Sequence, residues 1–363
     1  MRIGVDGLKI PESVRRGPLG SLDHGFELGM AGLFFRTVLQ MSPTLDAGEL
    51  RDIRQRADEL GMYIETGLGK VNPYATPETP ELRAMGDGDI VLGCRRIMEA
   101  CAAIDCRELW ASTASYKAAF RGRWAYDRFR TDVSWQEQLA ATAQFLAKLA
   151  PIARDLGIHL NLETHEEITS FELVRLVESV GPDVTGIVFD TGNVLQRVEH
   201  PVWAAQRVAP YVRQSHVKDC LIAHTDGGLS YQVRACGAGV IDFGALLPIL
   251  AAANPALNLS IENDESMDDR PRQRTQVLIE IYDPAFLAAH PDLTEAEKLA
   301  YMDLVRGYEQ RIADGAVPSF EEYAAQPFGY LEAVALIRTS AEHLRTICES
   351  QGLPLEARGR LLM

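Results

Sequence analysis

One pattern repeats along most of the chain: a short run rich in β-branched residues, a loop, and an amphipathic helix that often ends in glycine. Strands and helices that alternate in this way form parallel sheets, because each helix returns the chain to the start of the next strand. The predicted strands are 2–6, 32–38, 62–67, 108–112, 158–165, 185–191, 212–218 and 257–263. Predicted helices between them include 47–60, 90–104, 135–156 and 170–180.

Local signals mark the ends of these helices. Ser134 stands three residues before Glu137, which is the pattern of an N-terminal capping box. Gly61, Gly157 and Gly181 each follow the last apolar turn of a predicted helix, where glycine ends helices readily. A run of such units is typical of a closed (β/α)8 barrel. No Gly-x-Gly-x-x-Gly follows the first strand, which argues against a dinucleotide-binding half.

The pattern changes after the eighth strand, and a long amphipathic helix over 330–350 comes only later. We interpret that helix as the one that completes the eighth unit of a single barrel over 1–350, followed by a tail over 351–363. On this interpretation 266–327 is a helical insertion in the last strand-to-helix loop, and we expect a lid or a subunit contact on the catalytic face. The alternative is an appendage packed on the outside of the barrel.

Composition excludes several classes of partner. Lys and Arg number 36 against 51 Asp and Glu, which gives a net charge of −15. A nucleic acid or an anionic membrane attracts basic surfaces, so we expect neither as a partner. The six cysteines form no Cys-x-x-Cys pair and the first residues have no signal pattern, which predicts a cytoplasmic protein.

Metal-binding side chains stand at the ends of the last four predicted strands: Glu163, Asp190, His216 and Glu262. In a barrel these strand ends converge on the catalytic face. Three carboxylates in one apolar mouth repel one another unless a cation neutralises them. Three oxygen donors and one imidazole suit one Mn²⁺ or Mg²⁺ ion with open water positions better than a closed zinc site. The alternative for any one of them is an ordinary polar strand end.

His165 is the predicted general base. It follows Glu163 by two residues, so both side chains face the barrel lumen if the strand stays regular that far. A neutral imidazole beside a bound substrate is placed to take a proton from carbon or oxygen. The alternative is that His165 only orients a ligand or the substrate. Glu163 and Glu262 are also expected to take part in catalysis.

Lys218 is a fourth candidate for catalysis, because it shares a strand face with His216. An ammonium at this place would stabilise a developing oxyanion or pair with a substrate carboxylate. The alternative is a salt bridge to Asp190 or Asp219.

Four residues are candidates for binding the substrate: Asn193, Arg36, Trp110 and Arg123. Asn193 stands three residues after Asp190 and is expected to hydrogen-bond a substrate hydroxyl. Arg36 and Trp110 lie on the second and fourth predicted strands. Arg123 belongs to a loop over 112–132 in which basic and aromatic residues alternate. That loop is expected to bind an anionic or aromatic part of the substrate, or else to be a solvated loop held by its own aromatic residues.

The segments LETHEEITS, FDTGN, SHVKD, ACGAGVIDF and LSIEND, in this order, resemble the xylose isomerase-like barrels. That superfamily holds sugar isomerases, keto-sugar epimerases, inosose dehydratases, hydroxypyruvate isomerases and endonuclease IV. The resemblance implies one divalent metal ion, held at the four positions Glu163, Asp190, His216 and Glu262. Gly237–Phe243 resembles a turn of the family, Gly-x-Gly-x-Ile-Asp-Phe, which is structural.

Departures from the family pattern reduce the number of reactions that the resemblance implies. Epimerases and isomerases of this group usually carry Asp-x-x-His where this chain has Asp190-Thr-Gly-Asn193. Endonuclease IV-like enzymes need further histidines that FFRTV and YIETG lack. Glu163-x-His165 together with Asp-Thr-Gly-Asn is more similar to the catalytic α subunits of C-glycoside deglycosidases and to decarboxylases of 3-oxo sugar acids. The resemblance therefore implies proton abstraction from a 3-oxo sugar, 3-oxo glycoside or sugar acid, an enediolate, and bond cleavage.

Two other functions stay open. One is a sugar isomerase or keto-sugar 3-epimerase of the same superfamily. The other is a non-catalytic or partner-dependent barrel subunit, with an apolar contact face in the insertion made by Tyr282, Phe286, Leu287 and Tyr301. The expected partners are a small carbohydrate substrate, a second copy of the chain in a homo-oligomer and, for the subunit hypothesis, a small partner protein.

Overall fold

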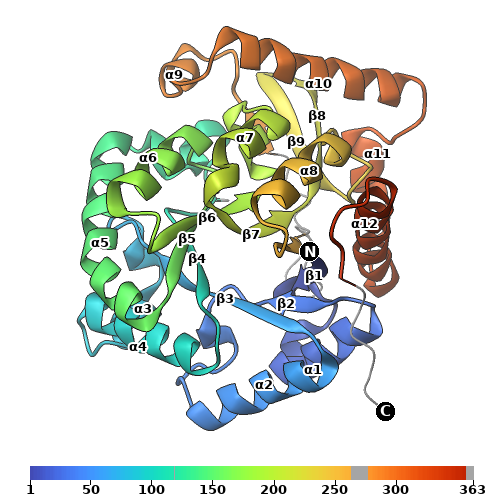
Figure 1. The fold of residues 1–363 in the computed structure, drawn as a ribbon. Helices are drawn as coiled ribbons and strands as arrows, with labels where there is room; N and C mark the ends of the chain where they lie inside the picture. Colours follow the sequence, from blue (N-terminus) through green and yellow to red (C-terminus); the bar gives the residue numbers. More distant parts are fainter. Residues whose placement is uncertain (118, 263–276, 357–363) are drawn as a thin grey trace.

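Eight parallel strands close into a barrel in a computed structural model that describes residues 1–117, 119–262 and 277–356 (Figure 1). Around the barrel the strands follow the order β1-β10-β7-β6-β5-β4-β3-β2, so the prediction of a (β/α)8 barrel is confirmed. The barrel strands are β1 (Arg2–Asp6), β2 (Gly32–Phe34), β3 (Tyr63–Lys70), β4 (Glu108–Ser112), β5 (His159–Glu163), β6 (Thr185–Asp190), β7 (Val212–Val217) and β10 (Asn258–Ile261).

Helices surround the barrel on the outside (Figure 1). They are α1 (Ser13–Glu27), α2 (Ala47–Leu60), α3 (Pro80–Ala84), α4 (Ile90–Ala103), α5 (Trp135–Leu156), α6 (Ser170–Val180), α7 (Pro201–Val208) and α8 (Phe243–Ala253). Their ends follow the sequence signals. Ser134 and Glu137 form the predicted capping box of α5, and Gly61 and Gly157 end α2 and α5 in the left-handed conformation, each with a φ of 63°.

A three-stranded antiparallel sheet that the sequence analysis did not predict lies beside the barrel. It consists of β8 (Asp219–Thr225), β9 (Gly228–Arg234) and β11 (Val277–Ile279), with β9 in the middle. The turn between β8 and β9 is Asp226-Gly227, a pair that favours two-residue hairpins, and Gly227 has a φ of 87°. The signal for this hairpin was therefore present in the sequence.

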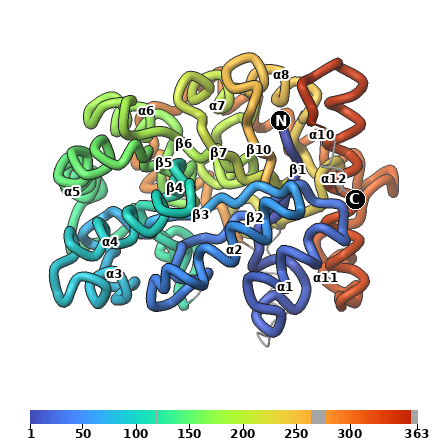
Figure 2. The backbone as a smooth tube through the Cα atoms, turned by 60° about the horizontal axis from the view of Figure 1, so that its bottom comes forward, coloured from blue at the N-terminus to red at the C-terminus, as the bar shows by residue number. Residues whose placement is uncertain are grey.

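The segment after β10 forms α9 (Pro284–Ala288), α10 (Glu295–Ala313), α11 (Phe320–Ala325) and α12 (Tyr330–Ser350). Helix α12 packs against β1, β10 and α8, and its Tyr330 hydroxyl lies 3.0 Å from His24 Nε2 of α1. Figure 2 shows α12 along the edge of the molecule near the first strand. Residues 266–276 of the expected insertion and 357–363 of the expected tail lie outside the described residues, and the role of 266–327 as a lid stays a prediction.

Asp219 holds the turn that follows β9. Its buried carboxylate accepts hydrogen bonds of 2.8–3.0 Å from the backbone amides of Cys220, Gly237, Gly239 and Ile241. A Cβ atom on Gly239 would lie 2.1 Å from Asp219 Oδ1, so only glycine fits there. The Gly-x-Gly-x-Ile-Asp-Phe segment thus has a structural role, as the sequence resemblance implied.

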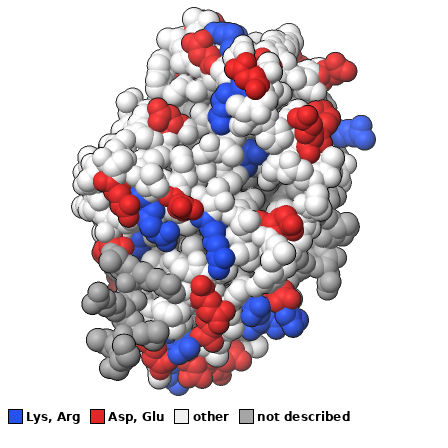
Figure 3. All heavy atoms as spheres, turned by 90° about the vertical axis from the view of Figure 1, so that its right-hand side faces the viewer, with Lys and Arg blue, Asp and Glu red and all other residues white. Residues whose placement is uncertain are grey.

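Charges on the surface are mixed on the face that carries α12, where Lys and Arg side chains stand among Asp and Glu side chains (Figure 3). In the described part of the chain, no helix combines the length and the apolar character that a bilayer crossing requires.

Candidate metal centre and active site

Four side chains from consecutive barrel strands meet at one end of the barrel. Glu163 ends β5, Asp190 ends β6, His216 lies next to last in β7, and Glu262 follows β10 directly. Because β5, β6, β7 and β10 are neighbours in the closed sheet, these positions converge. All four residues are buried, and one potential ligand atom from each lies within 4.8 Å of the others. The structure therefore brings together the four residues that the sequence singled out.

Hydrogen bonds and packing fix this group. His216 Nδ1 lies 2.8 Å from Glu163 Oε1, and the indole Nε1 of Trp110 donates to Glu163 Oε2 at 2.8 Å. The ring of Phe34 stands 4.4 Å from the His216 ring, centre to centre. His216 Nε2 is buried and has no hydrogen-bond partner among the described residues. A buried imidazole nitrogen without a partner is costly unless a ligand satisfies it, so the group is suited to holding a metal ion.

Two cations stand among the carboxylates. Lys218 Nζ lies 2.8 Å from Asp190 Oδ2 and 2.7 Å from Glu262 Oε2. Arg36 Nη2 lies 2.9 Å from Glu262 Oε1, and its guanidinium stacks on the Trp110 ring at 5.7 Å. The alternative of a salt bridge between Lys218 and Asp190 is thus observed, together with a second one to Glu262. Arg36 and Trp110 both lie at the metal-binding group, where the prediction of a substrate-binding role requires them.

Burial and charge move the pKa values of the four residues apart. Burial, together with the charges of Glu262 and Glu163, raises the pKa of Asp190 to about 8 although Lys218 opposes it. Burial also favours a higher pKa for Glu163. The positive charges of His216 and His165 outweigh burial and lower the pKa of Glu163 to about 2. The pKa of Glu262 is held well below its ordinary value because Lys218, His216 and Arg36 outweigh burial.

The pKa of His216, the histidine of the group, is raised by the surrounding carboxylates. Burial lowers the pKa of an imidazole, yet the negative charges of Glu163, Glu262 and Asp190 raise the pKa of His216 to about 9. Lys218 and Arg36 offset part of the negative charge of these carboxylates, and a divalent cation held by the four residues would offset more of it.

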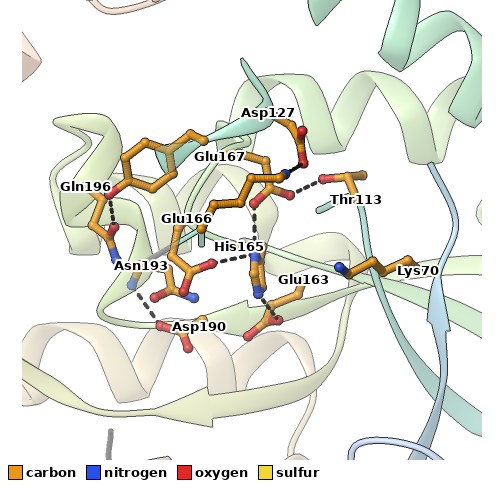
Figure 4. Close-up of polar contacts among 12 residues, drawn as sticks. Lys70, Thr113, Asp127, Glu163, His165, Glu166, Glu167, Asp190, Asn193 and Gln196 are labelled. Atoms are coloured by element: carbon orange, nitrogen blue, oxygen red, sulfur yellow. Dashed lines mark hydrogen bonds and ion pairs between the residues drawn. The ribbon is translucent and has the colours of Figure 1, made fainter. Parts of the chain in front are cut away.

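His165 lies beside the metal-binding group, as predicted, but it is not part of a regular strand. Strand β5 ends at Glu163, so His165 stands in the following loop and not on the regular strand. Its backbone amide donates to the Glu163 carbonyl at 2.7 Å, and its Nε2 lies 3.7 Å from Glu163 Oε2. Burial opposes the charge of this ring, but Glu166, Glu167 and Glu163 outweigh it and raise the pKa of His165 well above its ordinary value. Figure 4 shows the ring between Glu163 and the two following glutamates.

Asn193 and Arg123 have different surroundings. The backbone amide of Asn193 donates to Asp190 Oδ1 at 2.8 Å, which places this buried residue next to a metal-binding carboxylate. Arg123 pairs instead with Asp283, while its backbone amide donates to Glu280 Oε2 at 2.7 Å. Arg123 thus connects its loop to the segment after β11, and its role in binding a substrate stays a prediction.

Side chains of the basic and aromatic loop over 112–132 contact neighbouring parts of the chain. Arg128 binds Glu172 at 2.7 Å and also donates to the Ala289 carbonyl, and the buried Tyr126 hydroxyl donates to Gln196 Oε1 at 2.7 Å. Two of its aromatic residues, Phe120 and Trp124, remain about half exposed. These contacts join the loop to α6, to the segment after β6 and to the segment after α9, and its role in binding a substrate stays a prediction.

The expected apolar contact face in the insertion is not formed. Phe286 and Tyr301 are fully buried in their own chain, where Phe286 stacks on Phe129 and Tyr301 donates to the Leu195 carbonyl at 2.8 Å. Of the four proposed residues, Tyr282 is 60% exposed and Leu287 is partly buried. Phe286 and Tyr301 are therefore not available for this face, because they pack within their own chain, which hydrophobicity alone does not distinguish from a contact with a partner. The need for a partner subunit stays a prediction.

The sequence analysis missed several residues near the site. Strand β3 continues past its predicted end at residue 67, through an irregularity between Gly67 and Gly69, and Lys70 is its last residue. Lys70 pairs with Glu78 (Figure 4 includes Lys70). Asp6, the last residue of β1, is buried and lies 3.8 Å from Arg36. Its position at a strand end was a signal that could have identified it.

The sequence matches the family described as xylose isomerase-like TIM barrels over residues 23–281. The chain belongs to this family. It is 24% identical over 252 residues to 3-oxo-isoapionate decarboxylase from Pectobacterium atrosepticum, a match that covers 68% of this chain and 78% of that protein. It is also 28% identical over 199 residues to the uncharacterized protein YihM of Escherichia coli, covering 55% of this chain. The match spans 60% of the length of YihM.

Solved structures of sugar epimerases share the barrel. The structure of D-allulose 3-epimerase from Methylomonas sp. matches 96% of this chain and 98% of its own with a TM-score of 0.57 and 14% identity. At this identity the similarity establishes the fold and not the reaction.

Proposed function

We propose that the protein is a divalent-metal-dependent enzyme that removes a proton or a carboxylate next to the carbonyl of a carbohydrate-derived compound and so cleaves a bond. The observation that carries this proposal is the buried group of three carboxylates and one imidazole, with the ring of His165 adjoining it. We propose Mn²⁺ or Mg²⁺ as the ion, since oxygen-rich sites suit these hard cations.

The ion would bind at Glu163, Asp190, His216 and Glu262, supply a Lewis acid for a ketone oxygen and an enediolate, and oppose protonation of the nearby imidazole. His165 Nε2 would take the proton from the carbon next to the carbonyl, and the electron pair of the C–H bond would form the enediolate. Trp110 would keep Glu163 in place through its indole N–H.

Two reactions pass through such an enediolate. In elimination, its electron pair expels a leaving group from the next carbon, and the proton on His165 passes to the leaving group. In decarboxylation, the C–C bond to the carboxylate breaks, CO₂ leaves, and the electron pair forms the enediolate, which then accepts a proton that His165 has taken up from solvent. The similarity to a 3-oxo-isoapionate decarboxylase supports cleavage, and Arg36, whose side chain is 40% exposed, would pair with a substrate carboxylate.

An epimerase of the same family is the second candidate. An epimerase returns the proton to the same carbon from the opposite face, so it needs a second proton donor there. By the sequence resemblance, Asn193 stands where epimerases of this group usually carry histidine, and a carboxamide is neither an acid nor a base at neutral pH. This substitution favours cleavage.

The test is incubation of metal-loaded protein with 3-oxo sugars, sugar acids and ketoses in D₂O. Release of CO₂ or of a leaving group supports the lyase. Deuterium incorporation without cleavage would instead support the epimerase or isomerase. A protein that binds no divalent ion, measured by elemental analysis after loading and desalting, would overturn both proposals.

A further inference from the structure

Among the described residues, the close contacts of the His165 ring are made by Nδ1 and not by Nε2. Its Nδ1 lies 2.8 Å from Glu167 Oε2 and 2.6 Å from Glu166 Oε2, whereas Nε2 lies 3.7 Å from Glu163 Oε2 (Figure 4). An imidazole nitrogen that donates to a carboxylate leaves the other nitrogen for proton exchange. The contacts of Nδ1 therefore select Nε2 as the nitrogen that faces the metal-binding group.

Glu166 and Glu167 differ in how firmly they are fixed. Glu167 is 1% exposed, and its Oε1 accepts a hydrogen bond from the hydroxyl of Thr113 while Oε2 contacts His165. Arg128 also donates to the Glu167 backbone carbonyl at 3.3 Å. The side chain of Glu166 is 22% exposed. A carboxylate held through both oxygens keeps the ring that it contacts in one orientation, as partners behind a functional histidine commonly do.

The surrounding elements make this arrangement rigid. Thr113 directly follows β4 and is buried, so its hydroxyl is fixed by the barrel. Arg128, which holds the Glu167 carbonyl, also pairs with Glu172 in the first turn of α6. Glu172 in turn belongs to the capping box that starts this helix. The loop between β5 and α6 is thus tied to both of its flanking elements.

We propose that Glu167, held by Thr113, is the positioning residue that orients His165 so that its Nε2 faces the metal-binding group. This inference rests on the proposed function, in which His165 exchanges a proton with the substrate. Glu167 is buried and contacts His165 through its Oε2, so its loss should act on turnover through the orientation of the ring.

The first test compares Glu167→Gln with Glu166→Gln, which makes the same change of charge one residue away. We expect Glu167→Gln to lower kcat about 10- to 100-fold with KM and bound metal unchanged, and Glu166→Gln to cause a smaller loss. Thr113→Val, which removes only the hydroxyl, should lower kcat in the same direction, and Thr113→Ser, which restores it, should recover most of the turnover. A larger loss in Glu166→Gln than in Glu167→Gln would overturn the assignment.

The second test does not depend on turnover. In protein labelled with ¹⁵N-histidine and loaded with Mg²⁺, the His165 Nδ1–H signal, assigned by its absence in His165→Asn, should be protected from solvent exchange. This protection should persist in Glu166→Gln and disappear in Glu167→Gln, and its persistence in Glu167→Gln would contradict the inference. If the protection behaves as expected but no substrate exchanges a proton, the proposed function fails while the positioning role of Glu167 stands.

Discussion

Lys218 Nζ lies 2.7 Å from Glu262 Oε2, within the group of side chains that offers ligands to a metal ion. The same ammonium lies 2.8 Å from Asp190 Oδ2. Glu262 and Asp190 are both buried. Lys218 therefore offsets much of the negative charge of these two carboxylates when no divalent cation is bound. The chain thus carries its own monovalent cation in the place where a divalent one is expected to bind.

Replacing this lysine should separate the stability of the metal-free protein from its affinity for metal. In Lys218→Met we expect the metal-free protein to lose about 3 kcal/mol of stability, because two buried carboxylates lose their partner. Mn²⁺ should bind about tenfold more tightly, because the ion no longer shares these oxygens with a cation. Urea unfolding with EDTA and titration calorimetry with Mn²⁺ measure the two effects. Lys148→Met, at an exposed position, is the control. Weaker Mn²⁺ binding in Lys218→Met would contradict the prediction.

Glu163 and His165 should be separable by experiment. Glu163→Gln removes a ligand charge and one of the two carboxylate oxygens that contact His216 and Trp110, so we expect bound metal and activity to be lost together. His165→Ala leaves all four ligands in place, so it should retain stoichiometric metal and lose turnover. Elemental analysis and steady-state kinetics on the same preparations test both statements. Full turnover in His165→Ala would show that another group exchanges the proton.

The stability of the fold should depend on pH through Glu65. Burial raises the pKa of this carboxyl to about 7, although hydrogen bonds from Asn258 and Ser260 oppose the shift. The folded protein therefore binds this proton more tightly than the unfolded chain, in which a glutamate has its ordinary pKa of 4.5. The protonated Glu65 side chain therefore contributes about 3 kcal/mol to the free energy of unfolding. This contribution is fully present below a pH of about 4.5 and is lost as the pH rises through about 7.

Glu65→Gln isolates this contribution from those of other titrating groups. We expect the difference in unfolding free energy between the variant and the original protein to change by about 3 kcal/mol between pH 5 and pH 8, in favour of the variant at the higher pH. Urea unfolding in EDTA at several pH values gives this difference. Parallel curves for the two proteins would show that Glu65 titrates normally.

Asp219 should be among the most important polar residues for stability. Its carboxylate accepts four backbone N–H groups from the turn after β9, and its pKa is raised to about 6 because burial outweighs these hydrogen bonds. Asp219→Ala leaves these donors without a partner, so we expect a loss of about 3 kcal/mol in urea unfolding at pH 7. Asp226→Asn, in the exposed hairpin turn, should change stability little. Equal effects of the two substitutions would contradict this role.

Much of the barrel could be predicted because its signals are local. Glu137 and Ser134 cap α5 through contacts between neighbouring residues, and Gly157 ends the same helix through its own backbone conformation. The four strand-end residues were identified for a related reason. Once strand order is cyclic, the ends of consecutive strands meet whatever the detailed packing is. Local pattern and simple topology together placed Glu163 and Glu262 at one site.

Other features depend on partners that are distant in the sequence. The sequence left Lys218 with several possible roles, and only the folded chain places its ammonium against Glu262, 44 residues away. His165 reaches the site through a loop, and the partner of Glu167 is Thr113, the residue directly after the preceding strand β4. The side chains of Phe286 and Tyr301 turn inward because barrel surface was available to cover them.

The amino-acid sequence by itself determined the barrel and the residues at its strand ends, since backbone propensity, capping and hydrophobic periodicity act over a few residues. Only the tertiary structure decided which cation faces which carboxylate and which nitrogen of His165 faces the metal-binding group. These contacts depend on the positions of side chains from separate strands and loops. Their energies arise in a buried environment that exists only after the chain has folded.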